Sequence, residues 1–388
     1  MARRRAGPPR RGGGALDPAP NAPILIAGYY GLGNLGDEAV LAGLLAALRR
    51  LVPEGRVVVL SADPAATLSA HRVEAVARSP QGVWHALAGA GLLIMGGGSL
   101  VQDVTSARSA VYYLGVMLAA GVRGVPVAAV GQGIGPLRRR WIRGLARVAF
   151  TRAAVVDVRD RDSAATLAAL GVRRPVRVGA DLAFLLDPAP APVVQATLAR
   201  YRLDRARARI GVAFRAWAGL PPVATTGAVL RRFARAVDAD IAVLVFDRAR
   251  DRALGYELAA AADGRVVEVD TPAELLAFVG TMDLVVGVRL HALIFAVAQG
   301  VPAVGLAYDP KITAFAAEQG LPVVPVDASP EALARTLDAI WAVRGDLRAR
   351  LRPAAARLRE LAADAVAAAV AARRPRYPLA GVPATRPE

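Results

Sequence analysis

The stretch ILIAGYYGLGNLGDEAVLAGLLAALRRL, residues 24–51, contains one complete strand–loop–helix unit and decides the fold class. Residues 24–27 are all aliphatic, as expected of a short parallel strand that is buried on both faces. A glycine-rich loop occupies residues 28–36, and apolar residues then recur at helical spacing through residues 37–51. Such a unit predicts an α/β domain in which helices connect neighbouring parallel strands.

The same alternation repeats along the chain and predicts two such domains. A proline-rich break, DPAPAP at residues 187–192, stops regular structure between them. We expect strands at 24–27, 57–60, 92–95, 127–130 and 155–158, and then at 210–214, 241–246, 266–269, 284–286, 303–306 and 323–326. The predicted parts are a basic disordered tail at 1–20, an N-terminal α/β domain at 21–187, a linker at 188–205, a C-terminal α/β domain at 206–350, and a C-terminal helix and tail at 351–388. Two Rossmann-like, doubly wound domains of this kind predict a ligand site in the cleft between them.

Composition limits the classes of function. The 388 residues include no cysteine, which excludes disulfides, thiolate catalysis and cysteine-ligated zinc. No apolar run reaches the length of a membrane span, and residues 1–20 lack the apolar segment of a secretory signal, so we expect a cytoplasmic protein. The sequence also contains no cluster of metal-ligating residues, and we predict neither a metal nor a cofactor.

The net charge of +17 raises the question of an anionic partner. The arginines are scattered, aromatic residues make up 5% of the chain, and no stacking motif interleaves with the charge, so we expect no specific nucleic-acid binding. Weak attraction to an anionic membrane surface or to a phosphorylated substrate fits better. Our hypothesis is that the arginines of the N-terminal tail hold the protein at the inner face of a membrane. The oligomeric state stays open.

Lys311 is the only lysine among 49 basic residues. Arginine has replaced lysine everywhere else, so the surviving lysine marks a place where a compact, mobile ammonium is needed. The alternative is a chance survivor on a solvated loop. Its position, 20 residues after His291 and shortly after a predicted strand, favours chemistry.

Three glycine-rich segments follow strands of the first domain, at residues 28–38, 96–103 and 131–136. In the first segment, glycines at 31, 33 and 36 with Asp63 after the next strand match a dinucleotide fingerprint. Asp37 suits hydroxyl recognition or base chemistry better, or it simply caps the helix. Three glycine segments at successive strand ends predict a rim that approaches a ligand closely.

Cationic side chains follow other strands. Arg159 lies at a strand end and either grips a carboxylate or pairs with a neighbouring aspartate. Arg289 and His291 stand at a strand-to-helix junction, where an imidazole serves as acid, base or phosphate donor. Together with Lys311 they imply a small, doubly charged anion. His71 and His85 lie in ordinary contexts, and we interpret both as structural.

Taken in order, these motifs resemble those of polysaccharide pyruvyl transferases of the CsaB type. The resemblance runs from about residue 24 to about residue 326, and it is carried by the ordered set GYYG-x-GNLGDE, GGGS, GQGIGP, VRD, RLHA and YDPK at residues 28–38, 96–99, 131–136, 158–160, 289–292 and 308–311. It implies a fold similar to GT-B glycosyltransferases. It also implies transfer of the enolpyruvyl unit of phosphoenolpyruvate to two sugar hydroxyls, which forms a pyruvate ketal and releases phosphate.

The resemblance also implies partners and residue roles. Phosphoenolpyruvate is the co-substrate, and the acceptor is a lipid-linked cell-wall saccharide that contains N-acetylmannosamine. His291 is expected to supply a proton, Asp37 to engage the acceptor hydroxyl as a base, and Lys311 to stabilise the leaving phosphate. The residues expected to bind phosphoenolpyruvate are Arg159, Arg289, Leu290, His291 and Lys311, with Arg215 as a further candidate. Those expected to orient the sugar are Asn34, Asp37, Gly97, Ser99, Gln102 and Gln132.

Three alternatives stay open on the sequence alone. A GT-B glycosyltransferase would use a nucleotide sugar and would need an acidic residue for the ribose, such as Glu268 or Asp270. A dinucleotide-binding oxidoreductase would rest on the first glycine segment and Asp63. A basic binding protein that docks on anionic lipid or nucleic acid would need only the charge.

Overall fold

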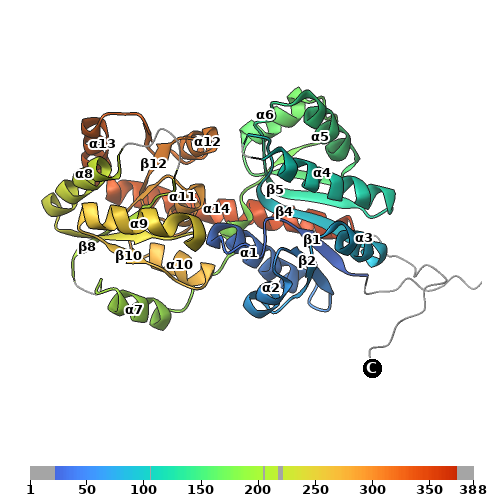
Figure 1. Ribbon diagram of the computed structural model, residues 1–388, viewed down its shortest axis with the longest axis horizontal. Helices are drawn as coiled ribbons and strands as arrows, with labels where there is room; N and C mark the ends of the chain where they lie inside the picture. The colour runs from blue at the N-terminus through green and yellow to red at the C-terminus, as the bar shows by residue number, and fades with distance from the viewer. Residues whose placement is uncertain (1–21, 105, 204–205, 217–221, 374–388) are drawn as a thin grey trace, which may run out of the picture.

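The computed structural model describes residues 22–104, 106–203, 206–216 and 222–373 (Figure 1). The tail predicted to be disordered at 1–20 lies outside these residues. The same holds for residues 204–205 of the predicted linker and for the last part of the predicted C-terminal tail.

Seven parallel strands form the first sheet in the order β3-β2-β1-β4-β5-β6-β7. These strands are β1 (Ile24–Ala27), β2 (Val57–Ser61), β3 (Glu74–Ala77), β4 (Leu92–Val101), β5 (Val127–Ile134), β6 (Val155–Val158) and β7 (Arg177–Val178). The chain order reverses between β1 and β4, and ligands of such sheets bind beyond the carboxyl ends of the strands at that point. Two short edge strands, β3 and β7, were not predicted, because neither forms an aliphatic run.

The second sheet is also parallel, with six strands in the order β10-β9-β8-β11-β12-β13. Its strands are β8 (Ala208–Ala213), β9 (Ala239–Leu244), β10 (Arg265–Val267), β11 (Leu284–Gly287), β12 (Ala303–Ala307) and β13 (Val323–Pro325). The reversal lies between β8 and β11. The predicted fold class, two doubly wound α/β domains, is therefore confirmed.

Helices cover both sheets. They are α1 (Leu35–Leu51), α2 (Pro64–His71), α3 (Pro80–Gly89), α4 (Ala107–Val122), α5 (Arg140–Arg152), α6 (Arg161–Ala169), the 3-10 helix η1 (Leu182–Leu185), α7 (Ala191–Arg200), α8 (Val223–Ala236), α9 (Arg248–Ala262), α10 (Pro272–Val279), α11 (Leu290–Ala298), α12 (Pro310–Gln319), α13 (Pro330–Ala342) and α14 (Arg344–Ala371). Within the described residues, none is both long enough and apolar enough to cross a bilayer.

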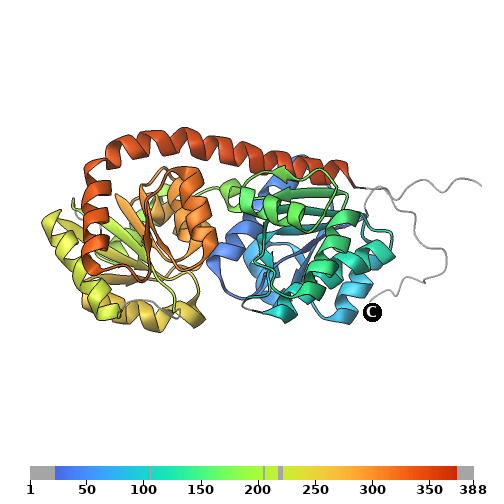
Figure 2. The same ribbon diagram turned by 90° about the horizontal axis from the view of Figure 1, so that it is seen from above.

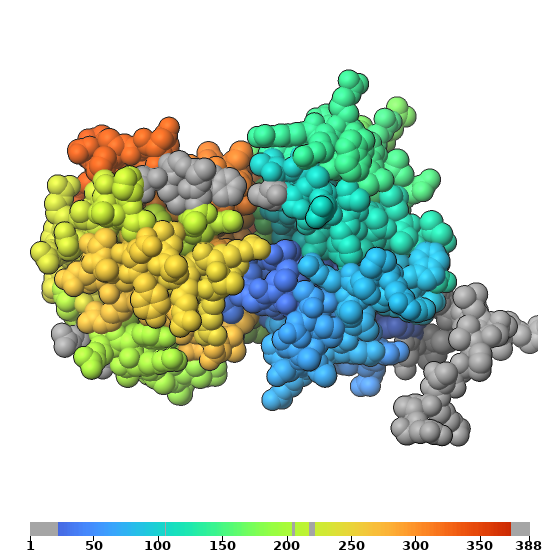
Figure 3. Space-filling model, in the orientation of Figure 1, coloured from blue at the N-terminus to red at the C-terminus, as the bar shows by residue number. Residues whose placement is uncertain are grey.

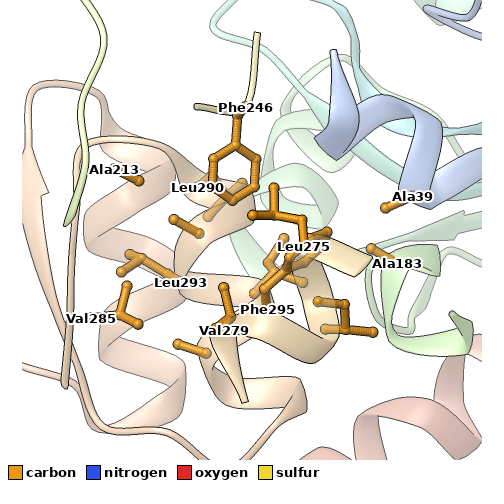
Figure 4. Packing of buried hydrophobic residues seen from close by; sticks show 14 of the residues in the cluster. Ala39, Ala183, Ala213, Phe246, Leu275, Val279, Val285, Leu290, Leu293 and Phe295 are labelled. Atoms are coloured by element: carbon orange, nitrogen blue, oxygen red, sulfur yellow. The ribbon is translucent and has the colours of Figure 1, made fainter. Parts of the chain in front are cut away.

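Two hydrophobic clusters hold the fold together. One lies between the first sheet and helices α3, α4 and α5. The other begins at α1 and η1 on the opposite face of that sheet and continues without a break into the second domain. Figure 4 shows Ala39 and Ala183 of the first domain on the side of the cluster nearest to Leu275 of the second domain. The two domains therefore share a core rather than only a linker.

Two expectations about the connection between the domains need correction. Ten residues of the predicted linker form α7, and Pro192 lies in its first turn rather than stopping it. Proline is tolerated there because the first N–H groups of a helix lack intrahelical partners. The last helix, α14, begins at Arg344 rather than at the predicted residue 351. It runs back along the first domain, where Arg359 donates to Asp187 at 2.5 Å (Figure 2).

Strands β4 and β5 extend beyond the predicted ends. Both continue through their glycine segments, with register shifts between Gly98 and Val101 and between Ala129 and Gln132. Gly97, Gly98 and Gly131 adopt positive φ angles, which glycine adopts without strain. These segments are therefore bulged strand ends. They bring the backbone of the sheet to the domain seam, which is the surface along which the two domains meet.

Candidate active site

The loop between β1 and α1 is fixed by Glu38 and Asn34. Glu38 accepts a hydrogen bond from Gly31 N at 2.9 Å, and its second oxygen lies 2.8 Å from His71 Nε2. Asn34 caps α1 by accepting from Gly36 N at 3.0 Å. His71 is therefore structural, as expected, and it acts by holding the first glycine segment through Glu38.

The dinucleotide interpretation of this loop finds no support in the packing. A Cβ atom at Gly31 would lie 2.1 Å from Ser61 Oγ, so this glycine is needed for contact with the end of β2. Asp63, the proposed ribose ligand, caps α2 by accepting from Ala66 N at 3.0 Å. Gly31 therefore serves close packing against the end of β2, and Gly36 serves contact with His291.

Asp37 lies in the first turn of α1 and faces the seam between the domains. Burial, together with the negative charges of Glu38 and Asp181, raises its pKa from 3.8 to about 7, and Arg289 and Arg159 oppose this shift only in part. The backbone of Gly98 lies next to its carboxyl group, since a Cβ there would be 3.5 Å from Oδ1. Near neutral pH this carboxyl group is therefore partly protonated and is able to give or take a proton.

Arg159, at the end of β6, is buried in a network of the first domain. It donates to Ser99 Oγ at 2.8 Å, to Asp181 at 3.2 Å and to Asp160 at 3.4 Å. Gly133 allows this arrangement, because a Cβ at that position would lie 2.7 Å from the guanidinium. Ser99 and Arg159, predicted separately, are thus direct partners. Of the two alternatives for Arg159, the structure shows the pairing with aspartates, and the side chain also lines the pocket between the domains.

Arg289 precedes α11 in the second domain and pairs with Asp251, which is fully buried. Burial raises the pKa of Asp251, although the Arg289 guanidinium opposes that shift. The Nε atom of Arg289 is buried and has no hydrogen-bond partner within the described residues. Buried polar groups rarely stay unpaired, so this atom marks a place for a ligand.

His291 links the two domains. A Cβ at Gly36 would lie 2.3 Å from His291 Nδ1, so the ring rests directly on the first turn of α1. The Nε2 atom is buried, lies 3.9 Å from Asp181 Oδ2, and has no hydrogen-bond partner in the described part of the chain. Burial, together with the nearby cations Arg159, Arg289 and Lys311, lowers the pKa of His291 from 6.5 to about 4, although the charge of Asp181 opposes this shift. The imidazole is therefore neutral at pH 7.

Lys311 lies in the first turn of α12, and its ammonium is 2.9 Å from Asp309 Oδ2. A pocket between the domains is lined by Arg159 and Asp181 from one side and by Leu290, Lys311 and Phe315 from the other. Figure 3 shows an indentation between the two domains at the top of the view. Each of the cations Arg159, Arg289 and Lys311 already has a carboxylate partner, which fixes its orientation.

The remaining predicted residues lie around this centre with different roles. Gln132 is buried and donates to the carbonyls of Met95 and Gly97 at 2.9 and 3.3 Å, so it braces the bulged end of β4. Gln102 accepts from Val104 N at 2.9 Å. Arg215 donates to the hydroxyl of Tyr308 at 3.5 Å, and its guanidinium lies 5.9 Å from the ring centroid.

Two functional carboxylates were missed by the sequence analysis, namely Asp181 and Asp251. Asp181 joins Arg159 to His291, and Asp251 pairs with Arg289, yet each lies at least 20 residues from its partner in the sequence. Asp181 follows the short strand β7, and because that strand forms no aliphatic run in the sequence, a search of the predicted strand ends does not reach this carboxylate. Asp251 lies inside α9, and no local signal distinguishes it from the surface charges of that helix.

Exchanging Gly36 for alanine tests the contact between α1 and His291. We expect a loss of stability of about 1–3 kcal/mol because the added methyl group overlaps the imidazole. Gly115 in α4 is the matched control, since a Cβ there meets nothing within 4 Å and alanine favours a helix by about 1 kcal/mol. Thermal unfolding should therefore shift in opposite directions for the two variants. Equal stabilisation by both would show that His291 does not rest on Gly36.

Known structures share this fold at low sequence identity. The UDP-GlcNAc 2-epimerase of Neisseria meningitidis, bound to UDP-GlcNAc, superposes with a TM-score of 0.59 at 11% identity over 90% of this chain and 99% of that one. A glycosyltransferase of Rickettsia africae gives 0.56 at 11% identity over 90% and 94%, respectively. Anabaena Alr3699/HepE, in complex with UDP and glucose, gives 0.54 at 13% identity over 91% and 97%. These likenesses show a GT-B-like fold.

The acidic residues considered for a nucleotide ribose are occupied by ion pairs. Glu268 lies 2.9 Å from Arg252, and Asp270 lies 2.7 Å from Arg248. A search of curated proteins finds no match. The sequence model of the polysaccharide pyruvyl transferase family, in contrast, matches residues 34–310, a span that includes Asp37, Arg159, Arg289 and His291 and ends one residue before Lys311. This chain is therefore a member of the polysaccharide pyruvyl transferase family.

Proposed function

We propose that this protein transfers the pyruvyl unit of phosphoenolpyruvate to two hydroxyls of a lipid-linked cell-wall saccharide that contains N-acetylmannosamine. The observation that carries the proposal is that Arg159 and Lys311, from different domains, line one pocket, beside the buried His291 of the same boundary. The charges of Arg159, Arg289 and Lys311 all act on that one imidazole. Phosphoenolpyruvate carries a carboxylate and a phosphate, and separate cations from the two domains suit its two ends.

The proposed reaction needs no oxidant or reductant, because it is redox-neutral overall. The methylene carbon of phosphoenolpyruvate takes a proton, and the first sugar oxygen bonds to C2 and loses its own proton. The bond between C2 and the phosphate oxygen then breaks, and inorganic phosphate leaves. The second sugar oxygen bonds to C2 and completes the ketal. Of the two hydroxyl protons, one replaces the proton given to the methylene carbon, and the other leaves with the inorganic phosphate.

The protonation states favour a different division of roles from the one implied by the resemblance. Asp37 has a pKa of about 7 and is partly protonated, whereas His291 has a pKa of about 4 and is neutral. We therefore assign Asp37 as the acid that protonates the methylene carbon. His291 is assigned as the group that hydrogen-bonds the substrate and accepts a proton from an attacking hydroxyl.

Other residues of the seam bind and orient the substrates in this proposal. The ammonium of Lys311 stands at the end of a flexible four-carbon stem. It therefore stays with the phosphate while that group gains charge and leaves. Arg289 offers its unpaired Nε to the substrate while Asp251 holds the guanidinium in place. The acceptor sugar lies against the bulged ends of β4 and β5, near Ser99 and Gln102. Asn34, the N-cap residue of α1, contributes from the first glycine segment.

Amine-specific acylation tests the donor assignment, because Lys311 is the only lysine side chain. We expect phosphoenolpyruvate to protect Lys311 from acylation, measured by peptide mass spectrometry with the N-terminal amine as internal reference. Phosphoenolpyruvate should also raise the melting temperature by mass action, an effect that amounts to about 2.7 kcal/mol at a hundredfold excess over Kd. Lys311→Ala should lose that shift, and Lys311→Arg should keep part of it.

UDP-GlcNAc and inorganic phosphate are the comparison ligands. Protection and stabilisation by UDP-GlcNAc, with none by phosphoenolpyruvate, would refute the proposed donor and favour a nucleotide-sugar enzyme. The comparison is meaningful because the Neisseria epimerase with the same fold was solved with UDP-GlcNAc bound. Equal protection by phosphate alone would show that the carboxylate of the donor is not recognised.

A further inference from the structure

The exposed surface of α5 is basic, and the helix contains no acidic residue. Between Asp103 and Asp157 the sequence has no aspartate or glutamate, whereas arginine occurs at positions 108, 123, 138, 139, 140, 143, 147 and 152. Helix α9, in comparison, mixes its arginines with Asp251 and Glu257. Within the described residues, no ion pair joins Arg140, Arg143 or Arg147 to a carboxylate.

Two stripes of side chains run along the exposed face of α5. Arg140, Arg143 and Arg147 follow helical spacing, and all three are exposed. Trp141 and Val148 lie beside them, two turns apart, with exposed fractions of 59% and 41%. The opposite face of the helix, which includes Ile142, Ala146, Ala149 and Phe150, is buried in the core of the first domain. The exposed large apolar residues are therefore not part of the packing of this domain.

The position of α5 connects this face to the acceptor side of the site. The buried carboxylate of Asp103 accepts from Arg138 N and Arg139 N at 2.7 and 2.8 Å, which fixes the start of α5 to the segment that carries Ser99 and Gln102. In Figure 1, α5 and α6 lie at the top of the first domain, on the same side of the molecule as α12 of the second. A flat surface that touched α5 would therefore lie beside the cleft.

We propose that the exposed face of α5 docks on an anionic phospholipid bilayer. Arginines without acidic neighbours are attracted to anionic headgroups, and an exposed tryptophan beside an aliphatic residue inserts at the headgroup level. A polynucleotide would satisfy the arginines but leave the apolar stripe of Trp141 and Val148 without a partner. Docking would bring a lipid-linked acceptor to the segment at residues 99–103. That last consequence rests on the proposed function, whereas bilayer binding does not.

Vesicle flotation tests the docking surface on the full chain. Wild-type protein should float with phosphatidylglycerol–phosphatidylcholine vesicles and not with pure phosphatidylcholine. The double variant Arg143→Gln/Arg147→Gln should bind roughly tenfold to thirtyfold more weakly, given the usual contribution of each basic residue near an anionic surface. The matched control is Arg231→Gln/Arg232→Gln, which removes two exposed arginines from α8 in the second domain. That control should bind within about twofold of wild type.

Fluorescence identifies the inserted residue. Brominated lipids should quench part of the wild-type tryptophan emission, and the quenched part should disappear in Trp141→Phe while the signals of Trp84 and Trp341 remain. Phosphoenolpyruvate should stabilise all of these variants equally, because none lies at the seam. If the protein does not use phosphoenolpyruvate, that stabilisation should be absent and vesicle binding should remain. If α5 does not dock on bilayers, the stabilisation should remain and the α5-dependent vesicle binding should be absent.

Three results would overturn the docking surface. Equal weakening by both double variants would mean that net charge alone drives binding. Loss of binding on removal of residues 1–21, with wild-type binding by Arg143→Gln/Arg147→Gln, would place the contact in the N-terminal tail. Equally tight, equally α5-dependent binding to a DNA oligonucleotide would show a general polyanion surface.

Discussion

Asp37→Asn is expected to lower the rate of pyruvyl transfer by about 10²–10⁴-fold and, at the same time, to stabilise the folded protein above pH 7. The loss of rate follows because the amide cannot donate the proton that the methylene carbon needs. The gain in stability follows because the folded state raises the pKa of this carboxyl group from 3.8 to about 7. The ionised carboxylate is therefore a destabilising group in the folded protein.

The sign of the pH dependence follows from that shift. Below pH 3.8 the group is protonated in both the folded and the unfolded state, and it has no effect on stability. Between pH 3.8 and about 7 only the unfolded state releases the proton, so the free energy of unfolding falls as the pH rises. Above pH 7 the full penalty is present and amounts to at most about 4 kcal/mol. Asp37→Asn should remove this penalty, and its effect should vanish below about pH 4.

Two measurements check the Asp37 prediction, namely unfolding between pH 4 and pH 9 and turnover over the same range. Turnover of the wild type should fall as the pH rises above about 7, because the acid form is lost. Asp63→Asn is the matched control, since Asp63 caps α2 away from the seam and asparagine also caps helices. A fall in turnover below pH 7 instead would make Asp37 the base and restore the role expected from the family resemblance.

Arg289→Ala is expected to have the largest effect on stability. It leaves the carboxylate of Asp251 buried without its cation, and breaking a buried pair in this way costs about 3–5 kcal/mol. Pyruvyl transfer should fall by at least about 10²-fold, as it does when a donor to a developing charge is removed. Thermal unfolding should record the first effect, and turnover of the remaining folded protein the second.

A double variant separates folding from function. Arg289→Met/Asp251→Leu replaces the buried pair with apolar side chains of similar volume, and such exchanges are often neutral for stability. We expect it to regain most of the lost stability and none of the lost turnover. If turnover returned with stability, Arg289 would act only in folding, and its assignment to phosphoenolpyruvate would be wrong.

The sequence predicted the fold well because buried parallel strands are aliphatic throughout. The eleven predicted strands correspond to β1, β2, β4, β5, β6 and to all strands of the second sheet. The edge strands β3 and β7 escaped because edges contact solvent and lack this signature. The helix α7 was not predicted because proline breaks a helix in its interior but is tolerated in its first turn. The composition alone does not distinguish the two positions.

The candidate site also contains features that the sequence determined and features that only the tertiary structure determined. The sequence determined which cations, glycines and polar side chains stand at the carboxyl ends of strands, because strand ends are visible as breaks in aliphatic runs. Only the tertiary structure decided that Asp181 joins Arg159 to His291, that Asp251 holds Arg289, and that Gly36 supports the imidazole. Burial where the two domains meet also raises the pKa of Asp37 and lowers that of His291, and this burial requires both domains together. A pKa depends on distances and desolvation summed over the folded chain, and residue order alone specifies neither.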